Sequence, residues 1–256
     1  MIAYLCGEID SMKLFVLAIG VHPDDVELSC SGTLINEVRK GNAAGVVDLT
    51  QGELGTRGTA ETRAAEAAAA AAIMGLSARE NLGMRDGFFR NDEEHQMQVI
   101  RVIRKYRPEV ILANILDDRH PDHGRAGKLV AESAFLAGLS KIETVDEHGQ
   151  PQQRWRPKHV LHYIQDRFYE PDLVVDISSV FEQRMEAIRA YATQFHTGPA
   201  SKEGTQTYIS TSSFMDALIS RSRLMGKRIG VEFGEGFVSQ KSIGVRSLEG
   251  LVLEET

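Results

Sequence analysis

The feature that most constrains the fold of this chain is an apolar run at residues 16–20 that ends at the sequence HPDD, residues 22–25. A short, uninterrupted apolar run that ends near Gly and Pro is typical of a strand buried on both faces of a parallel sheet. A second apolar run, 110–115, is followed by the sequence HPDH at 120–123. Because functional groups of such sheets collect beyond the carboxyl ends of the strands, we expect the two motifs to meet at one edge of the sheet.

The order of the expected elements predicts an α/β fold. Strands and helices alternate with short connections from residue 13 to residue 139, which predicts a Rossmann-like parallel sheet with helices on both faces. Segments 159–165 and 172–177 alternate in polarity and are expected as further strands at the edge of the sheet, in an antiparallel arrangement. Helices are also expected at 180–193 and 213–226.

Length and composition predict a single domain. The chain has 256 residues, 42% of them hydrophobic, and no repeat or linker divides residues 12–256. Residues 1–11 lack the basic start and long apolar core of a signal peptide. Because residues 12–14 lead directly into the first strand, we expect Met12 to be the natural start and residues 1–11 to be a disordered or mis-assigned extension.

The charge and the cysteines narrow the class of protein. A net charge of −7 argues against nucleic acid as the main partner, which would require a basic surface. Two cysteines provide no disulfide framework, and no apolar run has the length of a membrane span. We therefore expect a cytoplasmic protein with no membrane partner.

The two histidine motifs suggest a metal centre. A catalytic zinc ion takes three protein ligands and keeps one open position, and His22, Asp25 and His123 would supply two imidazoles and one carboxylate. Asp24 cannot easily face the same point as Asp25, so it is left to act as a general base on a water molecule. His120 lies one helical turn before His123 and would lie on the same side of the metal.

This set of residues suits hydrolysis of an amide. The cation would acidify water and polarise a carbonyl group, a carboxylate would take the proton, and an imidazole would stabilise the oxyanion and protonate the leaving amine. Each motif alone has a structural alternative: a turn whose aspartate caps the next helix, or two unrelated histidines. Two such motifs after strands of one sheet favour the metal site, and the ligand set does not choose sharply among Zn²⁺, Fe²⁺ and Mn²⁺.

With Arg63 and Glu66 on one helix, these motifs resemble the LmbE or PIG-L family of zinc deacetylases, over residues 13–245. Segments 27–34, 52–58 and 81–89 further resemble the bacillithiol-biosynthesis deacetylases, which remove the acetyl group from N-acetylglucosaminyl malate. The resemblance implies one Zn²⁺ per subunit, with Fe²⁺ or Mn²⁺ as alternatives in the cell, and a small amino-sugar substrate. It also implies a homo-oligomer, for which a hexamer is expected from family members.

The resemblance assigns roles to individual residues. His22, Asp25 and His123 become the metal ligands, Asp24 the general base, and His120 the acid and oxyanion partner.

Further residues are assigned to the substrate. Arg63 and Asp86 match positions that hold sugar hydroxyl groups, although each has an ordinary alternative as a surface or turn residue. Arg57 and Arg85 are candidates for the malate carboxylates, because a guanidinium group suits a carboxylate, and solvated surface positions are the alternative. Some family members have an oxyanion-stabilising tyrosine where this chain has Asp118, so Tyr208 is a substitute candidate, and an ordinary loop tyrosine is the alternative.

Two rival functions follow from the sequence. The first is a related deacetylase or amidase that acts on another amino sugar or on a thiol conjugate. The second is a non-catalytic sugar- or nucleotide-binding module on a Rossmann-like sheet. That module predicts no metal and leaves the paired histidine motifs unexplained.

Overall fold

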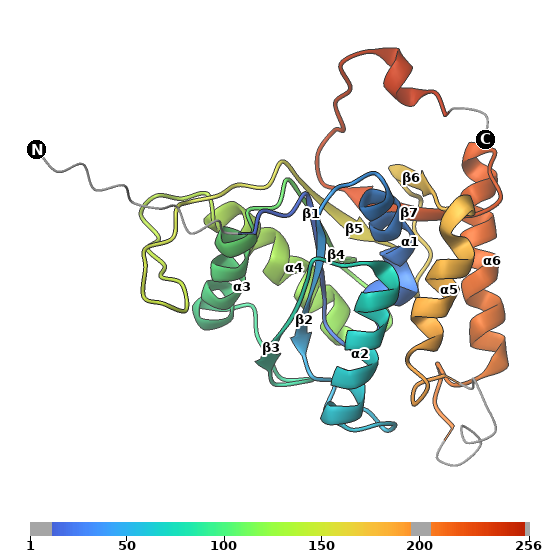
Figure 1. Ribbon diagram of the computed structural model, residues 1–256, viewed down its shortest axis with the longest axis horizontal. Coiled ribbons are helices and arrows are strands. Elements are labelled where there is room, and N and C mark those ends of the chain that lie inside the picture. The colour runs from blue at the N-terminus through green and yellow to red at the C-terminus, as the bar shows by residue number, and fades with distance from the viewer. Residues whose placement is uncertain (1–11, 196–205, 254–256) are drawn as a thin grey trace, which may run out of the picture.

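The computed structural model describes residues 12–195 and 206–253, and these form a central sheet covered by helices (Figure 1). The strands are β1 (Val16–Gly20), β2 (Ala44–Thr50), β3 (Ala78–Met84), β4 (Val110–Asn114), β5 (His159–Tyr163), β6 (Leu173–Asp176) and β7 (Gly234–Ser239). The helices are α1 (Asp25–Arg39), α2 (Ala60–Met74), α3 (Glu93–Tyr106), α4 (Pro121–Leu136), α5 (Phe181–Arg189) and α6 (Ser212–Ile229), with short 3₁₀ turns η1 (Ser178–Val180) and η3 (Leu248–Leu251). The predicted extension, residues 1–11, lies outside the described residues.

The strand order places the two histidine motifs side by side. The order is β3-β2-β1-β4-β5-β7-β6, and β1 pairs in parallel with both β2 and β4, with Val16 opposite Ala44 on one side and Val110 on the other. Successive strands therefore run outward from β1 in one direction up to β3 and then in the other direction from β4. Ligand sites of open α/β sheets form at such a switch point, beyond the carboxyl ends of the strands. The segments after β1 and β4 meet there.

The edge of the sheet confirms the predicted antiparallel strands, but at different positions. β5 pairs in parallel with β4 and antiparallel with β7, so it lies inside the sheet, and the expectation that 159–165 forms an edge was wrong. The outer position belongs to β6, which pairs only with β7. β7 itself was not expected, because Gly234 and Gly236 weaken its apolar pattern. A Cβ at either glycine would come within 3 Å of atoms of α6 or β6, so close packing requires the glycines.

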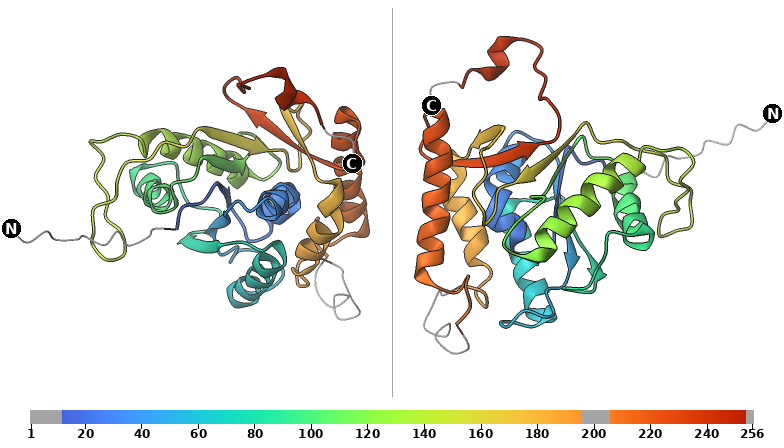
Figure 2. Two further views of the ribbon diagram at one scale, coloured as in Figure 1. Left: turned by 45° about the horizontal axis from the view of Figure 1, so that its top comes forward. Right: turned by 180° about the vertical axis from the view of Figure 1, so that it is seen from behind.

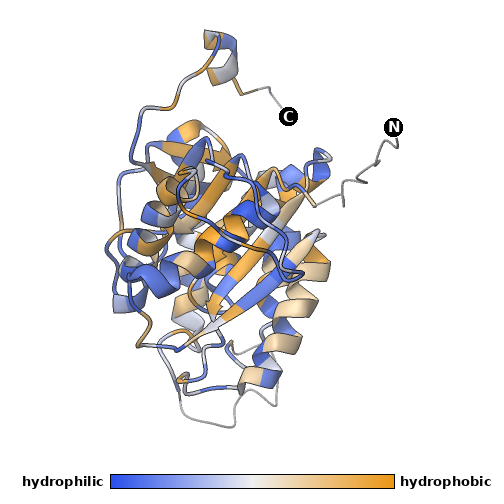
Figure 3. Ribbon diagram, turned by 90° about the vertical axis from the view of Figure 1, so that its left-hand side faces the viewer, coloured by the Kyte–Doolittle hydropathy of each residue, from blue (hydrophilic) through white to orange (hydrophobic). Residues whose placement is uncertain are grey.

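Helices cover both faces of the sheet, as predicted (Figure 2). One core cluster lies between the sheet and α1, α2, α5 and α6, and the other lies between the sheet and α3 and α4. Figure 3 shows the apolar strands in the middle of the molecule and more polar segments around them. In residues 12–195 and 206–253, no helix combines the length and the apolarity that crossing a bilayer requires.

Helix α1 is broken near its middle, and the break affects the position of side chains at the candidate site. Cys30 has non-helical dihedral angles (φ −146°, ψ 16°). The backbone N–H groups of Gly32 and Thr33, freed from the helix ladder, donate to the Glu235 carboxylate at 2.9 and 2.7 Å. The carbonyl of Leu28 accepts instead from two guanidinium groups, those of Arg184 at 2.9 Å and Arg221 at 2.7 Å. A buried carbonyl without its helical partner must find another donor, and α5 and α6 supply it.

Candidate metal centre and active site

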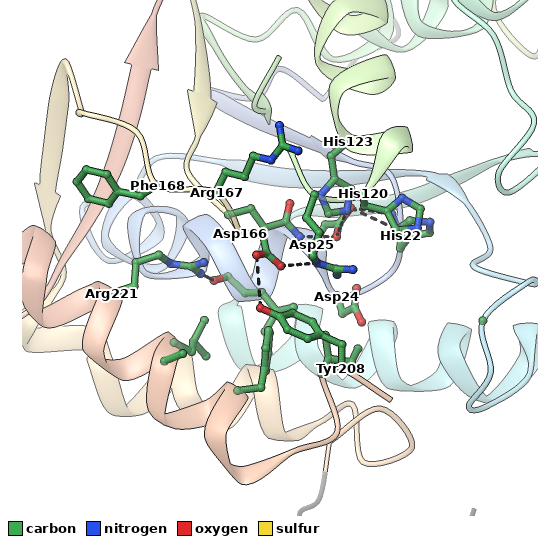
Figure 4. A pocket seen from close by; sticks show the side chains of 18 of the residues that line it. His22, Asp24, Asp25, His120, His123, Asp166, Arg167, Phe168, Tyr208 and Arg221 are labelled. Atoms are coloured by element: carbon green, nitrogen blue, oxygen red, sulfur yellow. Dashed lines mark hydrogen bonds and ion pairs between the residues drawn. The ribbon is translucent and has the colours of Figure 1, made fainter. Parts of the chain in front are cut away.

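The candidate site is a cavity of about 630 Å³ beyond the carboxyl ends of β1 and β4 (Figure 4). Its volume is typical of a pocket for a small molecule. We call one part the histidine end, formed by His22, Asp24, Asp25, His120 and His123. We call the other part the α6 end, formed by Phe168, Phe214, Leu218, Arg221 and Leu224.

The first motif is held in a turn by one of its own side chains. Asp25 begins α1, and its Oδ2 accepts hydrogen bonds from the backbone N–H groups of Val21 and His22, both at 3.1 Å. Asn114 at the end of β4 also donates to Oδ2, and Gln165 just after β5 donates to Oδ1 at 2.7 Å. Three strands therefore fix the position of this one carboxylate.

Three ligand atoms converge at the histidine end. Asp25 Oδ1 lies 3.3 Å from His123 Nε2, and Asp25 Oδ2 lies 3.6 Å from His22 Nδ1. One ligand atom from each of these residues lies within 4.8 Å of the other two. Nitrogen and oxygen atoms in this arrangement fit a divalent cation with an open position.

A second carboxylate holds each of the two histidines from behind. Asp86 Oδ1 lies 2.9 Å from His22 Nε2, and Asp118 Oδ2 lies 2.7 Å from His123 Nδ1. Such a contact places the ring proton on the far nitrogen and leaves the lone pair of the near nitrogen facing the centre. The tautomers therefore favour His22 Nδ1 and His123 Nε2 as ligands.

The charges around the two rings also fit a cation. Burial alone would lower the pKa of His22, but the carboxylates of Asp25 and Asp86 outweigh it and raise the pKa to about 10. The same opposition between burial and carboxylates, here Asp25 and Asp118, raises the pKa of His123 to about 9. A site that binds protons this strongly is one that attracts positive charge, which a metal ion can supply in their place.

A second group, His22, His120 and Asp122, also brings three ligand atoms together, but it suits a metal less well. Asp122 Oδ1 lies 2.7 Å from Arg125 Nη1, and its Oδ2 accepts from the backbone N–H of Gly87 at 2.9 Å. The Asp122 carboxylate is thus already paired with a guanidinium group, whereas the donors to Asp25, apart from the two histidine rings, are neutral amides. This difference favours the predicted set of His22, Asp25 and His123.

Asp24 lines the cavity next to the ligands with its carboxylate unengaged. Within the described chain, this carboxylate accepts no hydrogen bond from a protein group, although the residue is only 5% exposed. Burial, aided by the adjacent Asp25 carboxylate, raises the pKa of Asp24 to about 7, against the opposite effect of Arg63. Its φ of 141° is unusual for a residue other than glycine. Strained backbone of this kind is characteristic of functional sites, and here it turns Asp24 away from Asp25.

His120 caps the N-terminus of α4 and stacks on His123, with ring centroids 5.1 Å apart. Its Nδ1 accepts from the backbone N–H of Asp122 at 3.3 Å, so a neutral ring carries its proton on Nε2. Burial and the two neighbouring imidazoles lower the pKa of His120. The geometry thus gives His120 a neutral N–H donor.

The glycine-rich loop at 52–58 encloses Arg63. A Cβ added at Gly52 or Gly55 would lie 2.2 or 2.3 Å from the Arg63 guanidinium nitrogens, so a larger residue at either position would displace this guanidinium group. Arg63 Nη2 donates to Gln194 Oε1 at 2.6 Å, and its buried Nε has no protein partner among the described residues. Arg63 lines the cavity as expected of a substrate-binding residue, rather than lying on the helix surface beside Glu66.

The other predicted substrate residues differ in position. Asp86 lines the cavity but also orients His22, and its Oδ2 accepts from the backbone N–H of Leu54. Tyr208 lines the cavity with its hydroxyl 3.4 Å from Asp166 Oδ1. Arg57 and Arg85 do not line it: Arg57 Nε donates to the Thr193 carbonyl, and exposed Arg85 stacks on Phe88. The geometry gives no support to a carboxylate-binding role for these two arginines.

Several positions of the candidate site were not predicted from the sequence. Asp118 was noted only as the place of an absent tyrosine, and Asn114 and Gln165 were not considered at all. All three lie just after or at the carboxyl end of β4 or β5. Polar residues at the carboxyl ends of inner parallel strands are the sequence signal that would have indicated these positions. For Gln165 this signal requires β5 to be recognised as an inner parallel strand.

The chain matches the family model described as GlcNAc-PI de-N-acetylase (PIG-L) over residues 17–134. The crystal structure of the conserved protein TT1542 from Thermus thermophilus is 34% identical, with a TM-score of 0.78, and the match covers 91% of this chain and 98% of that chain.

Three relatives with named activities are similar in sequence to this chain. Diacetylchitobiose deacetylase of Thermococcus kodakarensis is 29% identical over 70% of both chains. 4-Oxalmesaconate hydratase of Pseudomonas putida is 26% identical over 70% of this chain and 74% of the relative. A probable N-acetyl-α-D-glucosaminyl L-malate deacetylase 2 of Bacillus anthracis is 24% identical over 71% of this chain and 82% of the relative.

Proposed function

This chain belongs to the PIG-L (LmbE) family of N-deacetylases, and we propose that it is a metal-dependent hydrolase that removes the acetyl group from an N-acetylglucosamine conjugate. The observation that carries the proposal is the convergence of His22, Asp25 and His123 beside the unengaged carboxylate of Asp24. A non-catalytic sugar-binding module would have no use for a strained, buried carboxylate in this place.

The metal site is proposed as a zinc site held by His22 Nδ1, His123 Nε2 and the Asp25 carboxylate. A divalent cation bound there would polarise the acetamide carbonyl and lower the pKa of a water molecule. Fe²⁺ and Mn²⁺ also accept this set of two imidazoles and one carboxylate.

The protein side chains supply the proton transfers. The Asp24 carboxylate faces the cavity and is placed to take the proton of the attacking water. The Nε2–H of His120 is placed to donate a hydrogen bond to the carbonyl oxygen as negative charge develops on it. The proton held by Asp24 can then pass to the departing sugar amine, which leaves with acetate as the second product. This scheme keeps His120 as the oxyanion partner and assigns to Asp24 the proton delivery expected of His120.

The sugar is proposed to lie between the histidine end and Arg63. Arg63 Nε has no partner among the residues that the structure describes, and each Asp86 oxygen keeps a lone pair for a hydroxyl group beyond the contacts described above. We propose N-acetylglucosaminyl malate as the substrate, on the resemblance of segments 27–34, 52–58 and 81–89 and on the Bacillus anthracis relative.

The test is release of acetate and free amine from N-acetylglucosaminyl malate, N,N′-diacetylchitobiose and free N-acetylglucosamine, measured side by side. The proposal expects release from at least one of them, and fastest release from the malate conjugate. Release only from diacetylchitobiose would keep the deacetylase and overturn the malate assignment.

Hydration is the second candidate, because a relative 26% identical is a hydratase. It predicts no acetate release from any acetylated sugar. The same assay therefore distinguishes the two reactions.

A further inference from the structure

The α6 end of the cavity contains an arginine without a carboxylate partner. Arg221 extends from α6 toward the cavity, across from the three histidines (Figure 4), and Arg167 and Phe168 of the segment after β5 also line the cavity. Its Nη2 donates to the Leu28 carbonyl at 2.7 Å. Within residues 12–195 and 206–253, no Asp or Glu oxygen lies within 4 Å of its guanidinium nitrogens.

The break in α1 fixes the position of this guanidinium group. Because Gly32 N–H bonds to Glu235, the Leu28 carbonyl is free to accept from both Arg184 and Arg221. Arg184 has its own counter-ion, since its Nε lies 2.9 Å from Glu235 Oε1. Arg221 is therefore held beside a second cation that is already neutralised.

The surroundings leave Arg221 charged but poorly compensated. Burial, followed by the nearby Arg184, lowers the pKa of Arg221 to about 10 against the opposite effect of the more distant carboxylates of Glu235, Asp166 and Asp118, so it remains a cation at neutral pH. A partly buried cation without a counter-ion is costly, and proteins retain such groups where a ligand supplies the missing charge.

The other cavity arginines are already engaged. Arg119 Nε lies 2.7 Å from Asp166 Oδ2, and Arg167 pairs with Asp117. Arg63 is enclosed by the glycine loop at the histidine end. Arg221 is thus the cavity guanidinium best placed to take an anion at a distance from the reacting acetamide.

The walls beside Arg221 are apolar. Leu218 is buried, and Phe214, Leu224 and Phe168 line the same part of the cavity. Apolar side chains beside a guanidinium group lower the local dielectric constant and so strengthen a hydrogen-bonded ion pair with a carboxylate.

From this arrangement we propose that Arg221 binds a carboxylate on the aglycone of the amino-sugar substrate and so selects acidic conjugates over neutral ones. This inference rests on the proposed deacetylase function and replaces Arg57 and Arg85 as the residues expected to hold the acid. Arg221 is a binding and specificity residue in this account, and it touches none of the reacting atoms.

The test compares kcat/KM for N-acetylglucosaminyl malate with kcat/KM for the neutral methyl glycoside of N-acetylglucosamine. We expect the ratio of acidic to neutral substrate to fall about 10- to 100-fold in Arg221→Met, the range for loss of a hydrogen bond to a charged group. Arg221→Lys keeps the cation but loses the planar fork, so its ratio should lie between those of Arg221→Met and the wild type. It also covers the case in which the methionine variant does not fold.

A matched control lies on the same helix. Arg223 is an exposed residue of α6 that stacks on Phe233 and lies outside the cavity, so Arg223→Met should keep the wild-type ratio. A parallel fall for both substrates in Arg221→Met and Arg221→Lys would assign Arg221 only to holding the Leu28 carbonyl, and would overturn the inference. A wild-type enzyme that releases acetate from both substrates without preferring the acidic one would also overturn it, but would leave the deacetylase intact. Release from neither substrate would defeat the deacetylase proposal and this inference together.

Discussion

The two ends of the cavity hold their polar groups in opposite ways. At the histidine end, Asp25 is fixed by contacts from the turn after β1, from β4 and from the segment after β5, and each ligand histidine has a carboxylate behind it. At the α6 end, Arg221 has one hydrogen bond to a protein group within the described part of the chain, and Phe168 is 56% exposed. The first arrangement fits chemistry that needs a fixed geometry, and the second fits recognition of a variable part of the substrate.

The largest loss of activity is expected from a substitution at the histidine end, at Asp24. We expect Asp24→Asn to keep the bound metal and to lose about 10²- to 10⁴-fold in kcat, because the general base is removed and the ligands are not. Metal content and acetate release measured on the same sample check this. A variant that keeps more than a tenth of the wild-type kcat would exclude Asp24 as the base.

The strained backbone at Asp24 should also affect the free energy of unfolding. Glycine adopts a φ of 141° without cost, so Asp24→Gly should be more stable than the wild type by about 1–3 kcal/mol while remaining inactive. Thermal unfolding of both metal-free proteins measures the difference.

Loss of the Asp118 carboxylate behind His123 should lower metal affinity or activity less than loss of Asp24 lowers kcat. Its effect should be larger than that of losing the neighbouring Asp117 carboxylate. Asp118→Ala is expected to lower metal affinity or activity about 10- to 100-fold, because His123 loses the partner that orients its ring. Asp117→Ala is the control, since that carboxylate is exposed and pairs with Arg167 on the surface. Equal effects of the two substitutions in a metal titration would contradict the positioning role.

A smaller effect on kcat is expected from substitution of Tyr208, which lines the cavity outside the histidine end. Its ring is 54% exposed and its hydroxyl lies 3.4 Å from Asp166, so we expect Tyr208→Phe to lower kcat less than about 10-fold. Loss of a true oxyanion donor costs about 10²- to 10³-fold in kcat. A loss of that size would make Tyr208 the missing oxyanion tyrosine and blur the distinction between the two ends.

The smallest effect on turnover is expected behind the site, at Asp48. Burial raises the pKa of this β2 residue to about 6, although Arg79 opposes the shift. Because the folded pKa lies above the ordinary value of 3.8, the stability gained from the bound proton is complete below about pH 4 and is lost as the pH rises through 6. Asp48→Asn cannot titrate, so its stability relative to the wild type should increase between pH 4 and pH 7. Urea unfolding across that range checks this, and a difference independent of pH would contradict it.

The convergence of the two histidine motifs could be predicted from the sequence because its information is local. Each motif directly follows an apolar strand, and parallel pairing of β1 with β4 brings the two motifs together without further specification. The predicted ligands His22, Asp25 and His123 therefore converge, with Asp24 beside them.

The α6 end was not predictable in the same way. Arg221 reaches the cavity only because α1 breaks at Cys30 and exposes the Leu28 carbonyl, which depends on Glu235 from a strand about 200 residues away. No local pattern records that contact. Long-range packing also explains why β7 was not predicted. Its glycines are required by the close approach of α6 and do not follow from strand propensity.

The most direct test of the whole account is metal removal and replacement on the native enzyme, with His123→Ala alongside. We predict that chelation abolishes acetate release from the acetylated amino sugar, that about one equivalent of a divalent ion per chain restores it, and that His123→Ala neither binds the ion tightly nor recovers. Undiminished acetate release from the metal-free protein would exclude a catalytic metal at the histidine end.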